Sequence, residues 1–230
     1  MCSGERDIGR IVKRRKLFVV AVCLCVGILI ALRLMKLLKP TKHDELKEGI
    51  VVRRGRILLP MPELEGRMSV EEAIATRRSI RSYERVPLKI KQVAQILWAA
   101  QGITDPRREF RATPSAGATY PLNVYLVVGE DASSHSLIIL RQGDVREELA
   151  RAALEQPWVK EALISLVITA VYERTTSRYG SRGIRYVRIE VGHVGQNVYL
   201  QAVALGLGTV AVGAFYDDEV RVVLGVGEDE

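Results

Sequence analysis

An apolar segment close to the N-terminus constrains this sequence more than any other feature. Residues 17–32 (LFVVAVCLCVGILIAL) carry no charge, and the apolar character continues to Leu38 with interruptions at Arg33 and Lys36. A bilayer is spanned by about 20 mainly apolar residues, and basic side chains near a helix end can extend to the membrane surface. We therefore predict one transmembrane helix, Leu17–Leu38, and a single-pass membrane protein.

Two other interpretations of this segment stay open. A secretory signal peptide has a similar basic start, although no convincing small-x-small cleavage site follows the apolar run. A buried core helix is disfavoured by the Lys and Arg clusters on both sides. Because both flanks are basic, the sequence leaves the orientation of the helix in the membrane open.

The positive charge is confined to the N-terminal part. The formal net charge of the 230 residues is +7, yet residues 1–43 hold ten Lys/Arg against two Asp/Glu. The rest of the chain holds 24 basic and 25 acidic residues. A nucleic-acid-binding domain carries its basic patch on the folded body, so we expect no nucleic-acid partner.

The chain divides into a basic tail (1–16), the transmembrane helix (17–38), a polar linker (39–67) and one folded domain (68–230). We expect one short strand in the linker, at Gly49–Val52 or Ile57–Leu59.

In the folded domain, apolar spacing and capping residues predict helices at Val70–Thr76, Ile90–Gln101, Val145–Leu154, Ile184–Leu205 and a short one capped by Asp217. Alternating or β-branched runs predict strands at Leu122–Val128, Ser136–Leu140, Leu163–Tyr172 and Thr209–Phe215. Few βαβ units are present, so the class is α+β, with a central sheet wrapped by helices.

Three motifs are candidates for a binding site. The first, RRSIRSY (77–83), has guanidiniums and hydroxyls suited to a phosphate, or it is a solvated basic turn. The second, TPSAGATYP (113–121), has small residues that let its backbone approach a flat ligand, or it is an ordinary loop. The third, GLGTVAVG (206–213), is not a dinucleotide fingerprint, because its glycines follow a helix and precede a strand.

The sequence of the folded domain shows neither a metal-binding pattern nor a pattern typical of a catalytic nucleophile. The three cysteines (Cys2, Cys23 and Cys25) all precede the folded domain, and the three histidines lack metal-ligand spacing. A lone His193 in a helix is more often a core or interface residue than a ligand. We expect no metal site and no Ser-His-acid triad.

Taken together and in this order, the motifs RRSIRSY, PSAGATYPLNVYLV and YGSRGIRYVRIEVGHVGQNVYLQAVALGLGTVAVGAFYDD resemble the nitroreductase-fold flavoproteins. The similarity is closest to their SagB-type branch, which includes azoline oxidases, and it spans about Met68–Val226. The resemblance implies a homodimer with a mostly antiparallel sheet and with FMN shared between subunits. Hydride would pass through N5 of FMN, with NAD(P)H as the expected donor and a small molecule or peptide as substrate.

The resemblance also implies roles for particular residues. The FMN phosphate and ribityl chain would be held by Arg77, Arg78 and Ser79, and Arg81 would favour negative charge on the reduced ring. The other subunit would line the isoalloxazine with Pro114, Ser115, Ala116 and Gly117. Backbone would pass along the flavin face at Val212, Gly213 and Ala214. Gln196 and Asn197 would lie near the dimer core.

Two departures from the family pattern affect the prediction. The sequence ends at Glu230, where the family usually continues into a last strand and a terminal basic residue. Where azoline oxidases have a Lys-Tyr pair on the substrate side, this sequence has Arg178 and Tyr179, and Arg is a poor general base. We therefore place a hydride-transferring oxidoreductase first, with an azoline oxidase or a flavin-binding remnant without turnover as alternatives.

Overall fold

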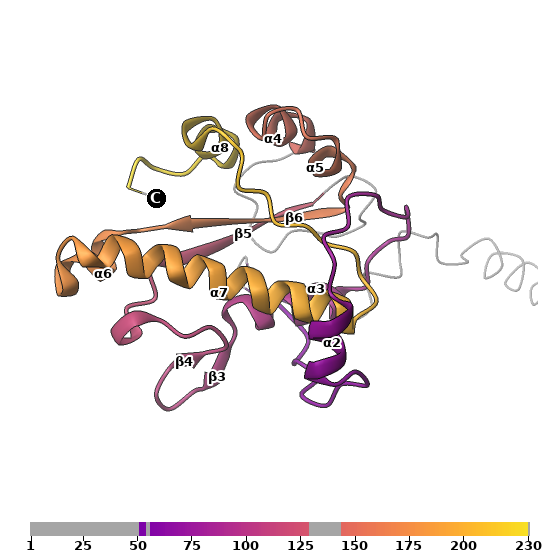
Figure 1. Ribbon diagram of the computed structural model, residues 1–230, viewed down its shortest axis with the longest axis horizontal. Helices are drawn as coiled ribbons and strands as arrows, with labels where there is room; N and C mark the ends of the chain where they lie inside the picture. The colour runs from indigo at the N-terminus through magenta and orange to yellow at the C-terminus, as the bar shows by residue number, and fades with distance from the viewer. Residues whose placement is uncertain (1–50, 54–55, 129–143, 230) are drawn as a thin grey trace, which may run out of the picture. The chain divides into compact units, whose positions relative to one another are not determined.

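The computed structural model describes residues 51–53, 56–128 and 144–229. Its central element is an antiparallel pair, β5 (Leu122–Val128) and β6 (Ile164–Ala170), which runs in register from Leu122 opposite Ala170 to Val128 opposite Ile164. One face of this pair is covered by α3 (Ile90–Gln101) and α7 (Arg182–Ala204), and the other face by α4 (Arg146–Ala152), α5 (Pro157–Glu161) and α8 (Asp217–Leu224) (Figure 1). The described residues thus form helix, sheet and helix layers, which confirms the α+β class.

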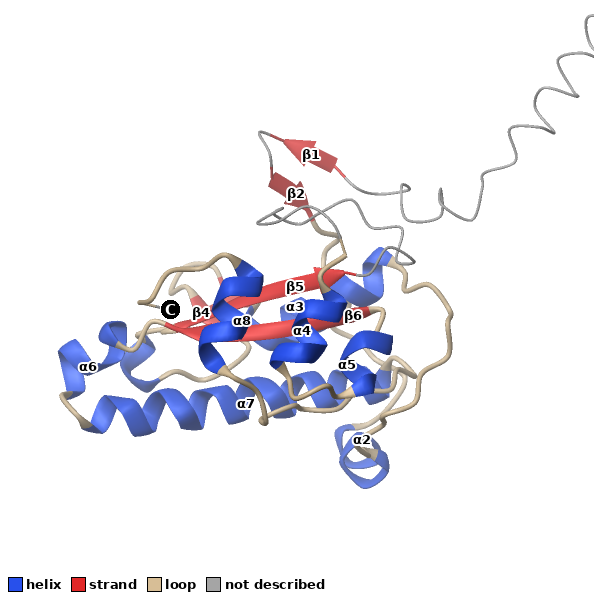
Figure 2. Ribbon diagram, turned by 90° about the horizontal axis from the view of Figure 1, so that it is seen from above, coloured by secondary structure: helices blue, strands red, loops and turns tan. Residues whose placement is uncertain are grey.

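Smaller elements complete the described part of the chain. Helix α2 (Val70–Thr76) packs against α7, and α6 (Glu173–Tyr179) leads into α7. Two short antiparallel hairpins are formed by β1 (Val51–Arg53) with β2 (Arg56–Leu58), and by β3 (Ile103–Asp105) with β4 (Phe110–Arg111). Figure 2 shows these elements from above.

Local sequence accounts for the helix ends. The hydroxyl of Ser69 accepts a hydrogen bond from the Glu72 backbone N–H at 3.1 Å and so caps α2 as its capping box predicts. Gly102 follows the last residue of α3. Gly206 has a φ of +71°, and the Leu207 N–H bonds back to the Ala202 carbonyl, which ends α7.

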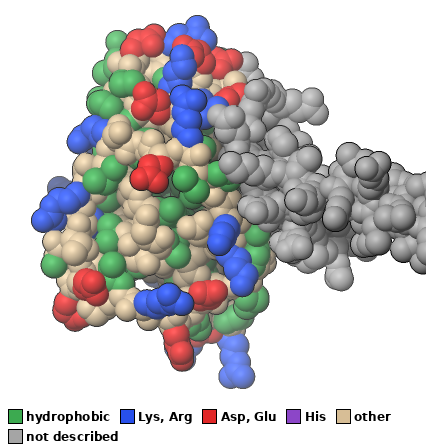
Figure 3. Space-filling view, turned by 90° about the vertical axis from the view of Figure 1, so that its right-hand side faces the viewer, with side chains coloured by type: hydrophobic (Ala, Val, Ile, Leu, Met, Phe, Trp, Pro, Cys, Tyr) green, Lys and Arg blue, Asp and Glu red, His purple; other side chains and the backbone are tan. Residues whose placement is uncertain are grey.

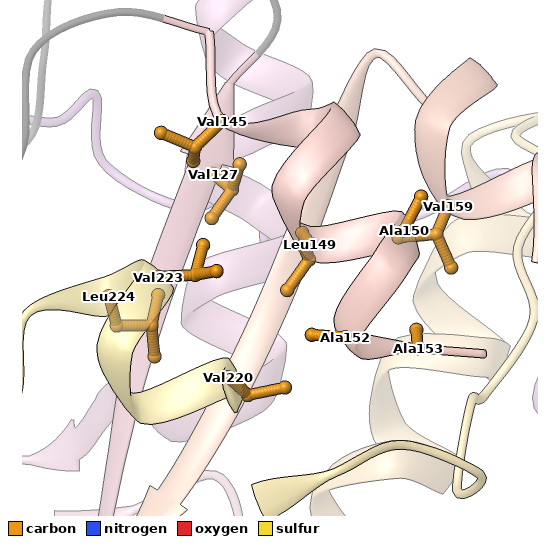
Figure 4. Packing of buried hydrophobic residues seen from close by; sticks show 10 residues of the cluster. All are labelled: Val127, Val145, Leu149, Ala150, Ala152, Ala153, Val159, Val220, Val223 and Leu224. Carbon is orange, nitrogen blue, oxygen red and sulfur yellow. The ribbon is translucent and has the colours of Figure 1, made fainter. Parts of the chain in front are cut away.

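Apolar residues gather on both faces of the β5–β6 pair. On one side α4, α5 and α8 enclose a cluster that Figure 4 shows from close by: Val127, Val145, Leu149, Ala150, Ala152, Ala153, Val159, Val220, Val223 and Leu224. On the other side Leu122 meets Ala100 of α3 together with Val187 and Val194 of α7. The second cluster fixes α7, and therefore its polar residues, against the sheet.

Several predictions need correction. Thr209–Phe215 forms no strand with any described residue; the segment instead makes isolated bonds to Ile80 and Tyr199. Asp217 is the first residue of α8, and Tyr216 is its N-cap. The linker holds a hairpin where one strand was expected. Helices α5 and α6 and the β3–β4 hairpin were not predicted.

Other predictions fall on parts of the chain that the structure does not describe. The expected strand Ser136–Leu140 and the expected transmembrane helix Leu17–Leu38 both lie outside the described residues. Within the described ranges, no helix is both long and apolar enough to cross a bilayer.

Candidate functional site

The first motif lies in the segment that leaves α2. The Arg77 guanidinium carbon lies 5.0 Å from the centroid of the Tyr199 ring, over its face, and Ser79 Oγ lies 3.0 Å from Tyr199 Oη. Arg78 Nη1 donates to the carbonyls of Ala75 and Arg77. The guanidiniums are thereby held at the surface beside α7, where a phosphate can reach them.

The third motif meets the first at the same tyrosine. The Ala211 N–H donates to Tyr199 Oη at 2.7 Å, and the Ile80 N–H donates to the Thr209 carbonyl at 2.9 Å. A Cβ atom on Gly208 would lie 2.9 Å from a methyl carbon of Ile80, so a side chain there would separate the two segments. The structure therefore brings 77–81 and 209–214 together, with Tyr199 between them.

We call the residues 77–81, Tyr199 and 209–214 the Tyr199 cluster. Arg81 and Ala214 connect this cluster to Trp158 of α5 and to Gln156, which precedes α5. The Arg81 guanidinium carbon lies 5.3 Å from the centroid of the Trp158 ring, and Gln156 Nε2 donates to the Ala214 carbonyl at 2.8 Å. Val212 packs against the apolar cluster below, while Gly213 and Ala214 are exposed. Burial raises the pKa of the nearby Tyr83 phenol, and Arg81 opposes that shift. At neutral pH Tyr83 is thus a neutral hydroxyl.

The second motif is a loop that packs beside another part of α7. Pro114 and Ser115 precede a one-turn helix, η1 (Ala116–Ala118), in which Gly117 has a φ of +60°. Ser115 Oγ accepts from the Tyr120 N–H at 2.9 Å. This bond closes the turn that presents Gly117 on the surface.

Asn197 supports the start of this turn. Its Nδ2 donates to the carbonyls of Ala99 and Ala112 and to Thr113 Oγ1, at 3.1–3.3 Å. Thr113 is fully buried and donates to the Ala100 carbonyl at 2.7 Å. Asn197 therefore joins α7, α3 and the second motif, while its neighbour Gln196 is exposed.

The predicted substrate-side pair contacts the second motif. Arg178 Nη1 donates to the Gly117 carbonyl at 3.0 Å. A Cβ atom on Gly117 would lie 2.4 Å from Tyr179 Oη, and the Tyr179 ring meets the Tyr186 ring edge-on at 5.2 Å between centroids. The structure thus places Arg178 and Tyr179 beside Gly117.

The two groups of residues lie at different places along α7. Tyr186, which marks the group around Gly117, and Tyr199, which marks the group around Arg77, are thirteen residues apart. At 1.5 Å per residue this separation is about 20 Å along the helix axis. Within one chain Gly117 therefore lies outside the group of residues around Tyr199, although Thr113, at the start of the second motif, is bonded to Asn197.

Charge and metal-ligand patterns narrow the chemistry. Among the described residues, Arg77, Arg78 and Arg81 form no ion pair with a carboxylate. No group of three or more His, Cys, Asp or Glu in the described part has metal-site geometry. Lys/Arg and Asp/Glu are interspersed on the face that Figure 3 shows. The cluster can therefore offer cations, hydroxyls and exposed backbone to an anionic, flat ligand.

Comparison with known proteins identifies the class. The profile of the nitroreductase family matches residues 74–230. A protein of Methanocaldococcus jannaschii, named as a candidate nitroreductase, is 48% identical over 181 residues, which cover 74% of this chain and 90% of the relative. The chain belongs to the nitroreductase family, and the family implies an oxidoreductase.

Solved structures agree on the fold. A candidate nitroreductase from Ralstonia eutropha superposes with a TM-score of 0.65 at 25% identity, covering 78% of this chain and 87% of that one. The NADPH:FMN oxidoreductase of Vibrio harveyi, solved with NAD⁺, superposes with a TM-score of 0.53 at 23% identity, covering 70% and 63%. These likenesses confirm the predicted nitroreductase-like fold.

Proposed function

We propose that this protein is an FMN-dependent oxidoreductase that transfers hydride between NAD(P)H and a small-molecule acceptor. The observation that carries the proposal is the junction at Tyr199, where a phosphate-binding type of segment (77–81) meets a segment of exposed backbone (209–214). FMN has an anionic phosphate end and a flat ring. At this junction, segment 77–81 suits the phosphate and segment 209–214 suits the ring.

The first segment fits the phosphate end of FMN. Arg77 and Arg78 have no carboxylate partner among the described residues, and Ser79 adds a hydroxyl. Guanidiniums bind phosphate oxygens through two parallel N–H bonds. Stacking on Tyr199 restrains the Arg77 guanidinium before any ligand arrives.

The second segment fits the ring of FMN. At Gly213 a Cβ atom would meet no atom within 4 Å, so the backbone of Val212, Gly213 and Ala214 is open to a planar ligand. Arg81, held over Trp158, would sit near the pyrimidine edge and favour negative charge on the reduced ring. Bound FMN supplies hydride transfer at N5, and the protein supplies position and charge.

A second copy of the chain completes the proposed site. Gly117 lies beside Tyr179, whose ring meets Tyr186, about 20 Å along α7 from Tyr199 within one chain. We therefore assign Pro114, Ser115, Ala116 and Gly117 to the isoalloxazine of a partner subunit. Helix α7 exposes three large apolar side chains, Ile184, Ile189 and Val191, at 41%, 49% and 36%, and such exposed apolar surface suits burial in a homodimer. The homodimer and its shared FMN sites are part of the proposal.

The geometry also bears on the choice of substrate. An azoline oxidase needs a base beside the flavin, and the residue that we match to that base is Arg178, which is a poor general base and already donates to the Gly117 carbonyl. A simple two-electron acceptor, such as a quinone or a nitroaromatic, makes no such demand. The Vibrio relative is named for NADPH and FMN, which supports a nicotinamide donor.

Membrane attachment through Leu17–Leu38 completes the proposal and rests on the apolar sequence alone. The full-length chain is expected to stay with the membrane fraction after a high-salt or alkaline wash, and a variant that begins at Leu46 is expected to leave it. Release of the full-length chain by the wash would contradict an integral anchor.

The decisive experiment is an absorbance spectrum of the detergent-purified, FMN-reconstituted full-length protein, before and after NADH or NADPH. A bound oxidised flavin spectrum that bleaches with one donor supports the proposal and identifies the donor. Absence of bound flavin after reconstitution would overturn it. A flavin spectrum that neither donor bleaches would refute the nicotinamide half-reaction and favour an oxidase that is reduced by its own substrate.

A further inference from the structure

A cavity of about 700 Å³ lies where the end of α3 meets the start of β5, and the segment around Pro60 forms a further part of its wall. We call it the α3–β5 cavity. No residue of the Tyr199 cluster lines it. Cavities of this volume are typical of sites for small organic ligands. The proposed FMN site therefore leaves this cavity without a role.

Part of the wall of the α3–β5 cavity is apolar and aromatic. Leu97 and Trp98 of α3 line it together with Leu122 of β5. Gly102 also lines it, and a Cβ atom there would lie 2.3 Å from Trp98 Cδ1, so the indole ring packs directly against the Gly102 backbone. The wall therefore includes an indole ring on which a flat apolar group can stack.

One amide in this wall lacks a partner. Gln101 is the last residue of α3 and lines the cavity, and both its Nε2 and its Oε1 are buried without a well-aligned hydrogen-bond partner among the described residues. A buried polar atom without a partner is unfavourable. An acceptor oxygen of a molecule in the cavity would satisfy the Nε2 donor.

The charged part of the wall is basic. Arg111 and Arg174 line the cavity, and no Asp or Glu of the described residues does. The Arg111 guanidinium carbon lies 4.9 Å from the centroid of the Tyr120 ring, and Arg174 Nη1 donates to the Tyr120 carbonyl at 3.4 Å and to Asn123 Oδ1 at 3.1 Å. Neither guanidinium forms an ion pair with a described carboxylate. Tyr120 thus holds two cations beside a cavity that lacks an acidic wall residue.

One buried acid interacts with Arg111 without lining the cavity. Glu190 of α7 is 2% exposed, and burial raises the pKa of its carboxyl group against the lowering effect of Arg111 and other neighbours. A carboxyl group that keeps its proton to a higher pH compensates less of the charge of Arg111. The positive charge of Arg111 is therefore left for a molecule in the cavity.

We propose that the α3–β5 cavity binds an aromatic monocarboxylate, with its ring against Trp98 and its carboxylate accepting hydrogen bonds from Arg111 and from Gln101 Nε2. A guanidinium binds a carboxylate through two parallel N–H bonds, and the side chain of Arg111 has no hydrogen-bond acceptor among the described residues that would compete. This binding site goes beyond the proposed oxidoreductase function and does not require bound flavin.

Calorimetric titration of the full-length, detergent-purified protein tests this inference with two probes. The first probe is 2-naphthoate and the second is 2-naphthamide, which has the same ring system and no charge, and the detergent buffer without protein is the blank. We expect one 2-naphthoate for each chain, bound at least about tenfold more tightly than 2-naphthamide. Absence of 2-naphthoate binding, or equal affinity for both probes, would overturn the inference.

Substitution of Arg111 assigns the charge. Arg111→Gln is expected to weaken 2-naphthoate by about ten- to hundredfold, the range for a hydrogen bond to a charged group, and to leave 2-naphthamide almost unchanged. Arg107→Gln removes an exposed guanidinium between β3 and β4 that does not line the cavity, and it is expected to behave as wild type. Unchanged 2-naphthoate affinity in Arg111→Gln would overturn the inference.

Substitution of Gln101 separates a ligand from the fold. Gln101→Leu replaces the unpaired amide by an apolar side chain, so it is expected to keep or raise the melting temperature of the protein without a probe and yet to weaken 2-naphthoate. A lower melting temperature together with unchanged 2-naphthoate affinity would mean that this amide serves the fold alone, and it would contradict the proposed contact.

A variant of the Tyr199 cluster separates the two sites. Arg78→Ala is expected to bind 2-naphthoate as wild type does, because Arg78 does not line the α3–β5 cavity. Loss of 2-naphthoate in Arg78→Ala would place the anion in the proposed phosphate site and overturn the inference. A protein that binds 2-naphthoate and no FMN would refute the proposed function alone, so the two proposals can fail separately.

Discussion

Tyr199 Oη lies 3.0 Å from Ser79 Oγ and 2.7 Å from the backbone nitrogen of Ala211, so one hydroxyl joins two segments that are more than 130 residues apart. Among the described residues, the backbone bond from the Ile80 N–H to the Thr209 carbonyl is the other hydrogen bond between these two segments. The geometry of the proposed cofactor site therefore depends strongly on a side chain that need not touch the cofactor.

Removing that hydroxyl is expected to weaken the site without unfolding the protein. Tyr199→Phe keeps the ring under Arg77 but leaves the Ala211 N–H and Ser79 without their partner, a loss of about 1–3 kcal/mol, or about ten- to hundredfold in FMN affinity if it is felt in full on binding. Flavin fluorescence titration measures it. Tyr216→Phe, which alters a half-exposed tyrosine outside the cluster, is the matched control. Equal affinity of Tyr199→Phe and wild type would contradict a role in positioning.

Phosphate recognition by Arg78 predicts a difference between two ligands. Arg78→Ala is expected to weaken FMN by about ten- to hundredfold, the range for a hydrogen bond to a charged group, and to leave riboflavin, which lacks the phosphate, almost unchanged. Titrating both ligands into one preparation gives the ratio directly. Arg107→Ala, in the β3–β4 hairpin, removes an exposed guanidinium of the same kind and serves as control. A parallel loss of both ligands in Arg78→Ala would indicate general damage instead.

Gly117 is expected to tolerate no side chain. Its φ of +60° costs a residue with a Cβ about 1–2 kcal/mol, and that Cβ would lie 2.4 Å from Tyr179 Oη and 2.8 Å from Arg178 Nη1. Gly117→Ala should therefore lower the melting temperature by several degrees and displace Tyr179. Gly66→Ala, with only a contact at 3.9 Å and no positive φ, should not. Unchanged stability of Gly117→Ala would mean that the turn readily moves.

Glu190 predicts how stability depends on pH. Because the folded-state pKa is raised above the ordinary value of 4.5, the folded protein binds the proton more tightly than the unfolded chain does. Below that value both states are protonated and wild type and Glu190→Gln should be equally stable. As the pH rises through the folded-state pKa, wild type loses stability and the variant does not. Urea denaturation across this window measures the difference, and a constant difference at all pH values would contradict the raised pKa.

Some of these elements are readable from sequence and others are not. Helix α3 has the predicted bounds because its apolar stripe and Gly102 are local signals. Pro157 at the first position of α5 is also a local signal, so the start of α5 is readable from the sequence although the helix was not predicted. The residues ERTTSRY of α6 have no apolar stripe, so packing on α7 and not periodicity makes them helical.

In the candidate site too, some residues can be recognised from the sequence and others only from their contacts in the structure. Arg77 and Ser79 attract notice by residue type, whereas Tyr199 is one more aromatic residue in an apolar helix until its partners at 79 and 211 are known. Thr209–Phe215 has the β-branched composition of a strand, yet it pairs with no strand among the described residues. Glu190 likewise reads as an exposed helix residue by its type, whereas in the structure it is 2% exposed because of how α7 packs.

The separation of the two motifs along α7 predicts that subunits complement one another. One chain would carry Arg77→Ala and Arg78→Ala, and the other would carry Gly117→Trp, whose side chain would collide with Tyr179 and distort the turn of the second motif. A dimer of either variant with itself has two damaged sites. A mixed dimer, purified through two different affinity tags, concentrates both defects in one site and leaves the other site intact, provided that each site draws its first motif from one chain and its second from the partner.

The mixed dimer is expected to retain one FMN for each two chains, measured by absorbance after gel filtration, while neither parent retains any. Mixed dimers as empty as their parents would mean that each site is built within a single chain, and the distance of about 20 Å along α7 would then have to be closed by another route.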